Sequence, residues 1–339
     1  MRVLLDTNIW IYLASHADAD ALAAATKAGG VEILVAPAAV YEAVNIKDQA
    51  ELRRRVDLLV DRRWRHLMPE AYWETGEIVT AIRALRPQWL LLNPPLQEVE
   101  DLYLSWQRAT KDGFWDRLER STANEAGIVK ALQQTVLDAA GEGFEALRAA
   151  TRPHDAQIWA APLQDWTAEL APNALHGPLP NRVKAWRADA YNHWTGLLLS
   201  HDVQPNPWDA NHAHIDWLSS AVDFAAARSN RRSWEAFWFV DVADYGMPRE
   251  WIRWAFKLLQ GASKLRGGTP GDNQLASYLL STDVLLTSDK VLARIAAKVK
   301  ADAPFPMATT VLVRGPDGAH AAEALRRIAE RDFAPPPLG

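Results

Sequence analysis

The sequence predicts an α/β fold in which both ends of the chain build one parallel sheet and a long helical segment interrupts it. Short aliphatic runs at 3–5 and 31–36 are separated by a helical stretch, and the same alternation resumes over 283–313. Strands joined by helical crossovers are typical of parallel sheets. Of the 16 tryptophans, 15 lie between Trp64 and Trp254, so the middle differs in composition from the ends. We expect sheet portions over 1–60 and 256–339, with a helical, Trp-rich insertion over 61–255.

The first elements follow from local residue types. Val3-Leu4-Leu5 is expected to be a strand because an aliphatic run stops there at the turn and cap residues Asp6-Thr7-Asn8. A helix follows, and Gly29-Gly30 ends the alanine-rich stretch after it. Val31 to Ala36 is predicted to be the second strand, with Pro37 at the first position of the next helix.

The last elements repeat this order. We predict a helix over 272–280, a strand over 283–287, a helix over 289–299, a strand over 310–313 and a helix over 319–331. In the insertion, helical patterns are predicted over 98–108, 114–120, 125–147, 183–199, 215–227 and 248–259, with no strand-rich stretch.

Composition excludes several classes of protein. The 37 Lys and Arg against 42 Asp and Glu give a net charge of −5, so no overall cationic field attracts nucleic acid. The absence of cysteine excludes disulfides, thiolate catalysis and Cys-ligated metals, and fits a reducing cytoplasm. The first aliphatic run meets Asp6 early, and no uncharged apolar stretch reaches about 18 residues. We therefore expect a cytoplasmic protein without a Sec signal or a membrane span.

Four acidic residues stand where a parallel sheet presents ligands. Asp6 ends the first strand, Glu42 lies on the helix after the second, Asp272 opens a helix, and Asp289 follows the strand over 283–287. Carboxylates that converge in one cleft repel each other unless a cation neutralises them. Oxygen ligands without sulfur favour Mg²⁺ or Mn²⁺. Taken singly, each Asp also has an ordinary explanation as a helix cap, and Glu42 as a surface residue.

The same residues resemble the PIN domain, a metal-dependent ribonuclease fold. The resemblance is carried by Leu4-Leu5-Asp6-Thr7-Asn8, by the Glu42 helix, and by Gly271 to Leu279 followed by Asp283 to Asp289. It covers about residues 1–60 and 262–315 of this chain. The long helical insertion departs from the compact toxins of that family.

The resemblance implies a role for each residue. Asp6, Glu42 and Asp272 would bind a first metal ion, and Asp289 a second ion or an activated water. Asn8 would orient Asp6, and Thr287 would cap the turn after its strand. The implied activity is endoribonucleolytic cleavage of single-stranded or structured RNA with one or two Mg²⁺ or Mn²⁺ ions, as in toxins, defence nucleases or RNA-processing enzymes. An antitoxin or regulatory protein would bind through the insertion. The alternatives are a non-catalytic PIN scaffold for protein interaction and a PIN-like nuclease acting on DNA; the oligomeric state is left open.

Two basic groups are candidates for contacts with the phosphate chain. Lys264 and Arg266 precede Asp272, and Arg53 and Arg54 lie with neighbouring arginines on a helix expected to continue from Glu42. The alternatives are a flexible loop and a solvated helix face. Residues 61–255 hold 20 Lys and Arg against 26 Asp and Glu, so a broad basic platform is not expected there.

Two further patterns in the insertion have competing interpretations. Tryptophan pairs at helical spacing, such as Trp234 with Trp238 and Trp251 with Trp254, favour helix packing over base stacking. His212-Ala213-His214-Ile215-Asp216, with His201, Asp202 and Asp209 nearby, has zinc-type ligands and is similar to the His-x-His-x-Asp-His run of metallo-β-lactamase-fold hydrolases. Trp217 replaces the last His, which favours a structural role for this segment as a loop leading into a helix.

Overall fold

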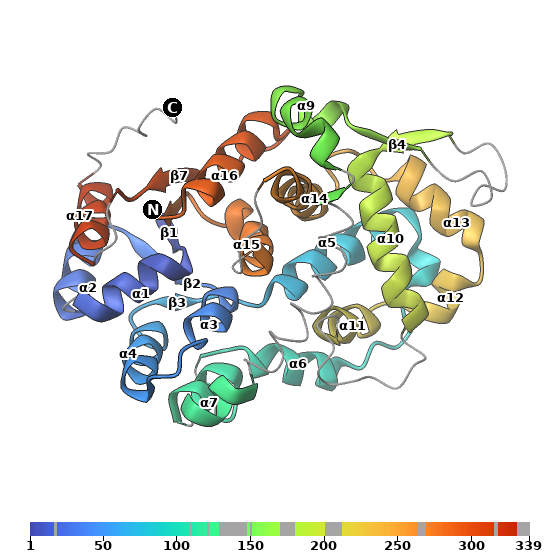
Figure 1. Cartoon of the computed structure of the whole chain (residues 1–339). Coiled ribbons are helices and arrows are strands. Elements are labelled where there is room, and N and C mark those ends of the chain that lie inside the picture. Colours follow the sequence, from blue (N-terminus) through green and yellow to red (C-terminus); the bar gives the residue numbers. More distant parts are fainter. Residues whose placement is uncertain are drawn as a thin grey trace.

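The main sheet is parallel and has strands from both ends of the chain (Figure 1). Across the sheet the strands are β3 (Arg65–His66), β2 (Glu32–Val35), β1 (Arg2–Leu5), β6 (Val284–Thr287) and β7 (Thr309–Leu312). A computed structural model describes residues 1–16, 19–108, 110–120, 122–128, 148–149, 151–169, 180–200, 212–263, 269–314 and 318–330. The predicted α/β class is confirmed. The strand β3 was not predicted, and it lies beyond residue 60.

Helices connect and cover these strands. Those from the first part of the chain are α1 (Thr7–His16), α2 (Ala19–Ala28), α3 (Pro37–Ala43) and α4 (Gln49–Leu59). The middle of the chain forms α5 (Glu70–Leu85), α6 (Leu96–Ser105), α7 (Phe114–Arg120), α9 (Asp155–Ala160), α10 (Ala185–Ser200), α11 (His212–Ser219), α12 (Phe224–Arg228), α13 (Arg231–Ala236) and α14 (Pro248–Gly261). The last part forms α15 (Thr269–Ala276), α16 (Lys290–Asp302) and α17 (Gly318–Ala329).

The middle of the chain also holds a short antiparallel pair that the sequence did not predict. Its strands are β4 (Thr167–Glu169) and β5 (Arg182–Lys184). The helix predicted over 125–147 lies mostly outside the described residues. Among the helices that the described residues form, none is both long and apolar enough to cross a membrane.

Alternate strand residues supply two separate cores, one on each face of the sheet. Val3 and Leu5 pack with residues of α1, α3, α4 and α17, whereas Leu4 packs with residues of α5, α10, α14 and α16. This division follows from the two-residue period of a strand, and burial of both faces explains why the strands are continuously apolar. Helices α5, α10 and α14 from the middle of the chain therefore belong to the core on one face of the sheet, whereas α7 belongs to the core on the other face. Figure 1 shows how these helices are arranged beside the sheet.

Most tryptophans of the middle segment belong to the core. Trp186, Trp194, Trp234, Trp238, Trp251 and Trp254 are all buried. The rings of Trp234 and Trp238 pack edge to face with centroids 5.7 Å apart, and those of Trp251 and Trp254 are 6.0 Å apart. The packing interpretation of these pairs is confirmed, because a buried indole presents no face to a nucleic-acid base.

Candidate metal centre at the carboxyl edge of the sheet

Neighbouring strands place Asp6 and Asp289 at the same edge of the sheet. β1 and β6 pair in parallel with Leu5 opposite Leu286, so both strands end at the same edge of the sheet. Asp6 follows β1 directly and is 3% exposed. Asp289 begins α16 as its N-cap, where Oδ1 accepts hydrogen bonds from the backbone N–H of Val291 and Leu292. The capping explanation of Asp289 is therefore correct, but it uses only one of the two carboxylate oxygens.

Buried hydrogen bonds fix the Asp6 carboxylate. The Thr287 hydroxyl donates to Asp6 Oδ2 at 2.7 Å, and Asn8 Nδ2 lies 3.5 Å from the same oxygen. Burial raises the pKa of Asp6 to about 6, and the charge of Asp289 adds to the increase, while the Thr287 hydrogen bond opposes it. Thr287 also accepts from the backbone N–H of Asp289 at 2.9 Å, so it caps this turn as predicted.

Glu42 reaches the site from α3, which Pro37 starts directly after β2. Its Oε1 is buried without a hydrogen-bond partner. Burial raises the pKa of Glu42 to about 7; a hydrogen bond with the Thr7 side chain lowers it, and the charges of Asp6 and Asp289 raise it further. A buried carboxylate oxygen without a donor is costly, and a cation is one group that would satisfy it.

Asp272 lies in the first turn of α15 and interacts electrostatically with the other three acids. Its pKa is raised to about 9, first by burial and then by the negative charges of Asp6, Glu42 and Asp289. The preceding residue, Gly271, is so close to Glu42 that a Cβ there would lie 2.1 Å from Glu42 Oε1. Glycine at position 271 therefore lets α15 pack against α3 without displacing the Glu42 carboxylate. The four acids named from the sequence thus lie close enough to influence one another electrostatically.

The oxygen donors of these four acids suit a hard divalent cation, but their side chains do not converge around one point. In the part of the chain that the structure describes, no three His, Asp or Glu side chains converge closely enough to hold a metal ion. The four carboxyl groups nevertheless interact electrostatically, and three of them have raised pKa values. Mutual repulsion keeps like charges apart, and an oxygen-coordinated cation such as Mg²⁺ or Mn²⁺ would draw them together.

The arginines near residues 53–65 are arranged differently from the prediction. The helix does not continue from Glu42: α3 ends at Ala43, and α4 starts separately behind the N-cap Asp48, which accepts from the N–H of Ala50 and Glu51. Arg62, Arg63 and Arg65 lie after α4 rather than on it. The four-residue spacing Asp48-x-x-Glu51 could have revealed this helix start in the sequence.

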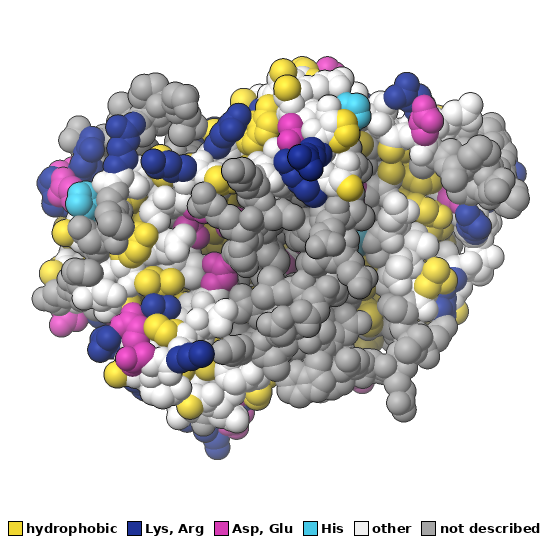
Figure 2. All heavy atoms as spheres, viewed as in Figure 1, with side chains coloured by type: hydrophobic (Ala, Val, Ile, Leu, Met, Phe, Trp, Pro, Cys, Tyr) yellow, Lys and Arg dark blue, Asp and Glu magenta, His cyan; other side chains and the backbone are white. Residues whose placement is uncertain are grey.

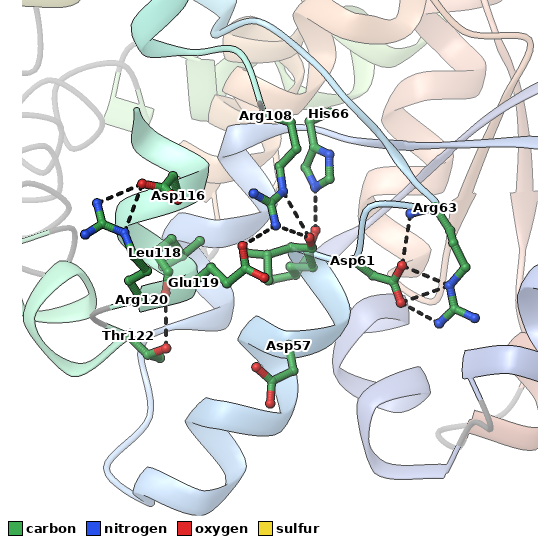
Figure 3. A network of polar contacts seen from close by, with 12 residues as sticks. Asp57, Asp61, Arg63, His66, Arg108, Asp116, Leu118, Glu119, Arg120 and Thr122 are labelled. Atoms are coloured by element: carbon green, nitrogen blue, oxygen red, sulfur yellow. Dashed lines mark hydrogen bonds and ion pairs between the residues drawn. The ribbon is translucent and has the colours of Figure 1, made fainter. Parts of the chain in front are cut away.

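Most of these arginines bind acids of this chain. Arg53 pairs with Asp57 and donates to Thr122, and Arg54 pairs with Glu51. Figure 3 shows that Arg63 also binds an acid of this chain, Asp61. In the same view Arg120 of α7 donates to Asp116. On the face shown in Figure 2, the described Lys and Arg side chains lie in separate small groups among Asp and Glu. A role of Arg53 and Arg54 in substrate binding remains a prediction. To bind a phosphate, these arginines would have to leave their present partners, Asp57 and Glu51.

Two other groups of residues were considered from the sequence. Lys264 and Arg266 lie outside the described residues. His214 lies within α11, and its Nε2 contacts Glu74 Oε2 at 2.9 Å. The segment from His212 is therefore helical from its first residue rather than a loop. His201, Asp202 and Asp209, the neighbours considered with it, also lie outside the described part of the chain.

Sequence reasoning missed polar residues that bond Glu42 or the helix that carries Asp272. Thr7 bonds Glu42, and Glu70 at the start of α5 contacts Gln274 of α15. The signal for Glu70 was its place just after a strand, but β3 is too short to be recognised. Comparison of the chain with protein-family models, with curated proteins and with solved structures finds no match. Its function therefore has to be inferred from its own residues.

Proposed function

We propose that this chain is a PIN-like, metal-dependent endoribonuclease that hydrolyses phosphodiester bonds. The observation that carries the proposal is that four carboxyl groups from separate elements interact at the carboxyl edge of a parallel sheet. Ligands of open α/β sheets bind at this edge. The order of these acids along the chain and the parallel sheet are compatible with a PIN-like fold. A toxin, a defence nuclease or an RNA-processing enzyme would each use such a site.

The resemblance to PIN domains implies a role for each of these residues. Asp6, Glu42 and Asp272 would hold a divalent cation, and Asp289 would bind a second ion or a water. The bound cation would neutralise the carboxylates, polarise a phosphodiester and lower the pKa of a water. Thr287 and Asn8 hold Asp6 in place, and Thr7 holds Glu42. The capping bonds of Asp289 use Oδ1, and Oδ2 would be available to accept a proton from an attacking water.

The test is cleavage of labelled single-stranded RNA and DNA with Mn²⁺, with Mg²⁺ and with EDTA. We expect cation-dependent cleavage of RNA by the wild-type protein, and its loss in Asp6→Asn and Asp272→Asn. Both variants should remain folded, since removing one of several repelling carboxylates costs little stability. Asp283→Asn is the matched control. Asp283 precedes β6 at the amino edge of the sheet, opposite the four acids, and pairs there with Arg2. Full activity in either site variant would exclude the proposed chemistry, and cleavage of DNA alone would identify the other nuclease class.

A further inference from the structure

The first turn of α5 is bonded to α15, the helix that carries Asp272. Gln274 Nε2 donates a hydrogen bond of 2.8 Å to Glu70 Oε1 across 204 residues of sequence. The Tyr278 hydroxyl, directly after α15, donates to the backbone carbonyl of Met68 at 2.9 Å and lies 3.5 Å from Glu70 Oε2. Both oxygens of Glu70 therefore face residues of the α15 region.

One turn further along α5, Glu74 makes a second connection. It is 2% exposed and accepts a hydrogen bond from the Ser277 hydroxyl, from the turn that follows α15. Its other oxygen lies 2.9 Å from His214 Nε2 and 3.2 Å from Arg253 Nη1. Burial alone would raise the pKa of Glu74, but the charge of Arg253 and the His214 and Ser277 bonds hold it at about 2. Glu74 is thus ionised and bonded on both oxygens.

These contacts matter because α15 is short and carries a predicted ligand at its start. Asp272 lies half a turn before Gln274, so the orientation of its side chain depends on how the rest of α15 is held. The helix packs against α3, which carries Glu42, and against α14. Glu70 and Glu74 come from the middle of the chain, outside the segments that resemble the PIN domain.

We infer that Glu70 and Glu74 are positioning residues which, through Gln274 and Ser277, hold α15 so that Asp272 stays beside Asp6 and Glu42. This inference rests on the proposed function and gives the middle segment a direct part in it. The two acids act through α15: their oxygens are occupied by donors of this chain. In metal sites, residues that orient a ligand typically change metal affinity about 10- to 100-fold when they are replaced.

The experiment combines calorimetric titration with Mn²⁺ and hydrogen exchange of the metal-free protein. Glu70→Ala and Gln274→Ala remove the bond, whereas Glu70→Gln keeps a carbonyl oxygen that accepts from Gln274. Gln97→Ala is the matched control, because Gln97 makes the same type of bond to Asp101 at 3.0 Å on the exposed helix α6. Circular dichroism establishes that each variant is folded.

We expect both bond-removing variants to bind Mn²⁺ about tenfold more weakly and to exchange amides of residues 269–280 faster. Glu70→Gln and Gln97→Ala should behave as the wild type. Unchanged hydrogen exchange in Gln274→Ala would overturn the inference. Faster exchange with unchanged Mn²⁺ affinity would also overturn it, because the bond between Gln274 and Glu70 would then have only a structural role. A wild-type protein that binds no Mn²⁺ would overturn the proposed function, and exchange would still show whether Glu70 holds α15.

Discussion

The hydroxyl of Thr287 donates a hydrogen bond of 2.7 Å to Asp6 Oδ2, although 281 residues separate them in the sequence. Thr287 is the last residue of β6 and is fully buried, and its oxygen also accepts from the N–H of Asp289. One side chain thus sets the position of two acids at once. The pairing of β1 with β6 makes this contact possible, because it aligns Leu5 with Leu286.

Replacing Thr287 by valine should impair the site more than the fold. Thr287→Val keeps the shape of the side chain but removes both hydrogen bonds, at a cost of about 1–3 kcal/mol of unfolding free energy. Since the bond lowers the pKa of Asp6, its loss should move that pKa above about 6. The acid limb of the pH–rate profile for RNA cleavage should therefore move to higher pH. Thr287→Ser keeps a hydroxyl and should retain the wild-type profile; an unshifted profile in Thr287→Val would contradict the assigned role.

The metal-free protein should lose stability as the pH rises. The pKa values of Asp6, Glu42 and Asp272 are raised to about 6, 7 and 9, so the folded state holds these protons more tightly than the unfolded chain. The resulting stabilisation is complete below the ordinary carboxyl pKa of about 4 and is lost as the pH passes each raised value. We expect the urea midpoint in EDTA to fall between about pH 5 and pH 9.

Two comparisons separate this effect from other titrations. Asp272→Asn should flatten the decline above about pH 7, because Asp272 has the highest pKa of the three. Mn²⁺ should bind more tightly as the pH rises, since binding displaces these protons. Calorimetry in buffers of different ionisation enthalpy measures the protons released. A urea midpoint that does not depend on pH in the wild type would show that the pKa values of these carboxyl groups are not raised in the folded protein.

Local sequence signals were sufficient for the strands β1, β2 and β6 and for the chain positions of three of the four acids. The aliphatic runs of β1 and β6 end at polar residues and that of β2 ends just before Pro37, so Asp6, Asp289 and the start of α3 could be placed from neighbouring residues. By contrast, β3 is two residues long and is a strand because Arg65 pairs opposite Leu34. Such a strand has no hydrophobic period of its own and depends on the partner strand.

Contacts between distant segments could not be predicted. Glu70 and Glu74 look like ordinary polar residues at the start of an amphipathic helix. Their role depends on Gln274 and Ser277, more than 200 residues away. The close approach of Gly271 to Glu42 is equally invisible in a single sequence, since it arises from packing of α15 on α3.

Removing Arg253 should destabilise the fold strongly. Arg253 pairs with the buried carboxylates of Glu74 and Glu250. Burial raises the pKa of Glu250 to about 7 even though Arg253 opposes it. Arg253→Met leaves buried negative charge without its partner, and we expect a loss of about 3–5 kcal/mol in urea unfolding. Arg326→Met, which breaks the exposed pairs with Glu323 and Glu330, should leave the unfolding free energy close to that of the wild type. Equal costs for the two variants would contradict this account of the buried network.

Replacing Gly271 by alanine should separate metal binding from stability. The added Cβ would meet the carboxylate of Glu42, which is the mobile end of a side chain and can move away at little cost. Alanine also favours a helix over glycine by up to about 1 kcal/mol, so the unfolding free energy should change by less than about 1 kcal/mol. The displaced Glu42 would no longer face Asp272, and Mn²⁺ affinity and RNA cleavage should therefore fall by at least about tenfold.

The control for this prediction is Gly76→Ala in α5. A Cβ at Gly76 meets no atom within 4 Å, so this variant makes the same chemical change in a helix without a collision. It should keep wild-type Mn²⁺ affinity and gain up to about 1 kcal/mol of stability. Calorimetry and urea unfolding of both variants give the comparison. If Gly271→Ala binds Mn²⁺ as tightly as Gly76→Ala does, Glu42 is not a ligand, and the cation would have to be held by Asp6, Asp272 and Asp289 alone.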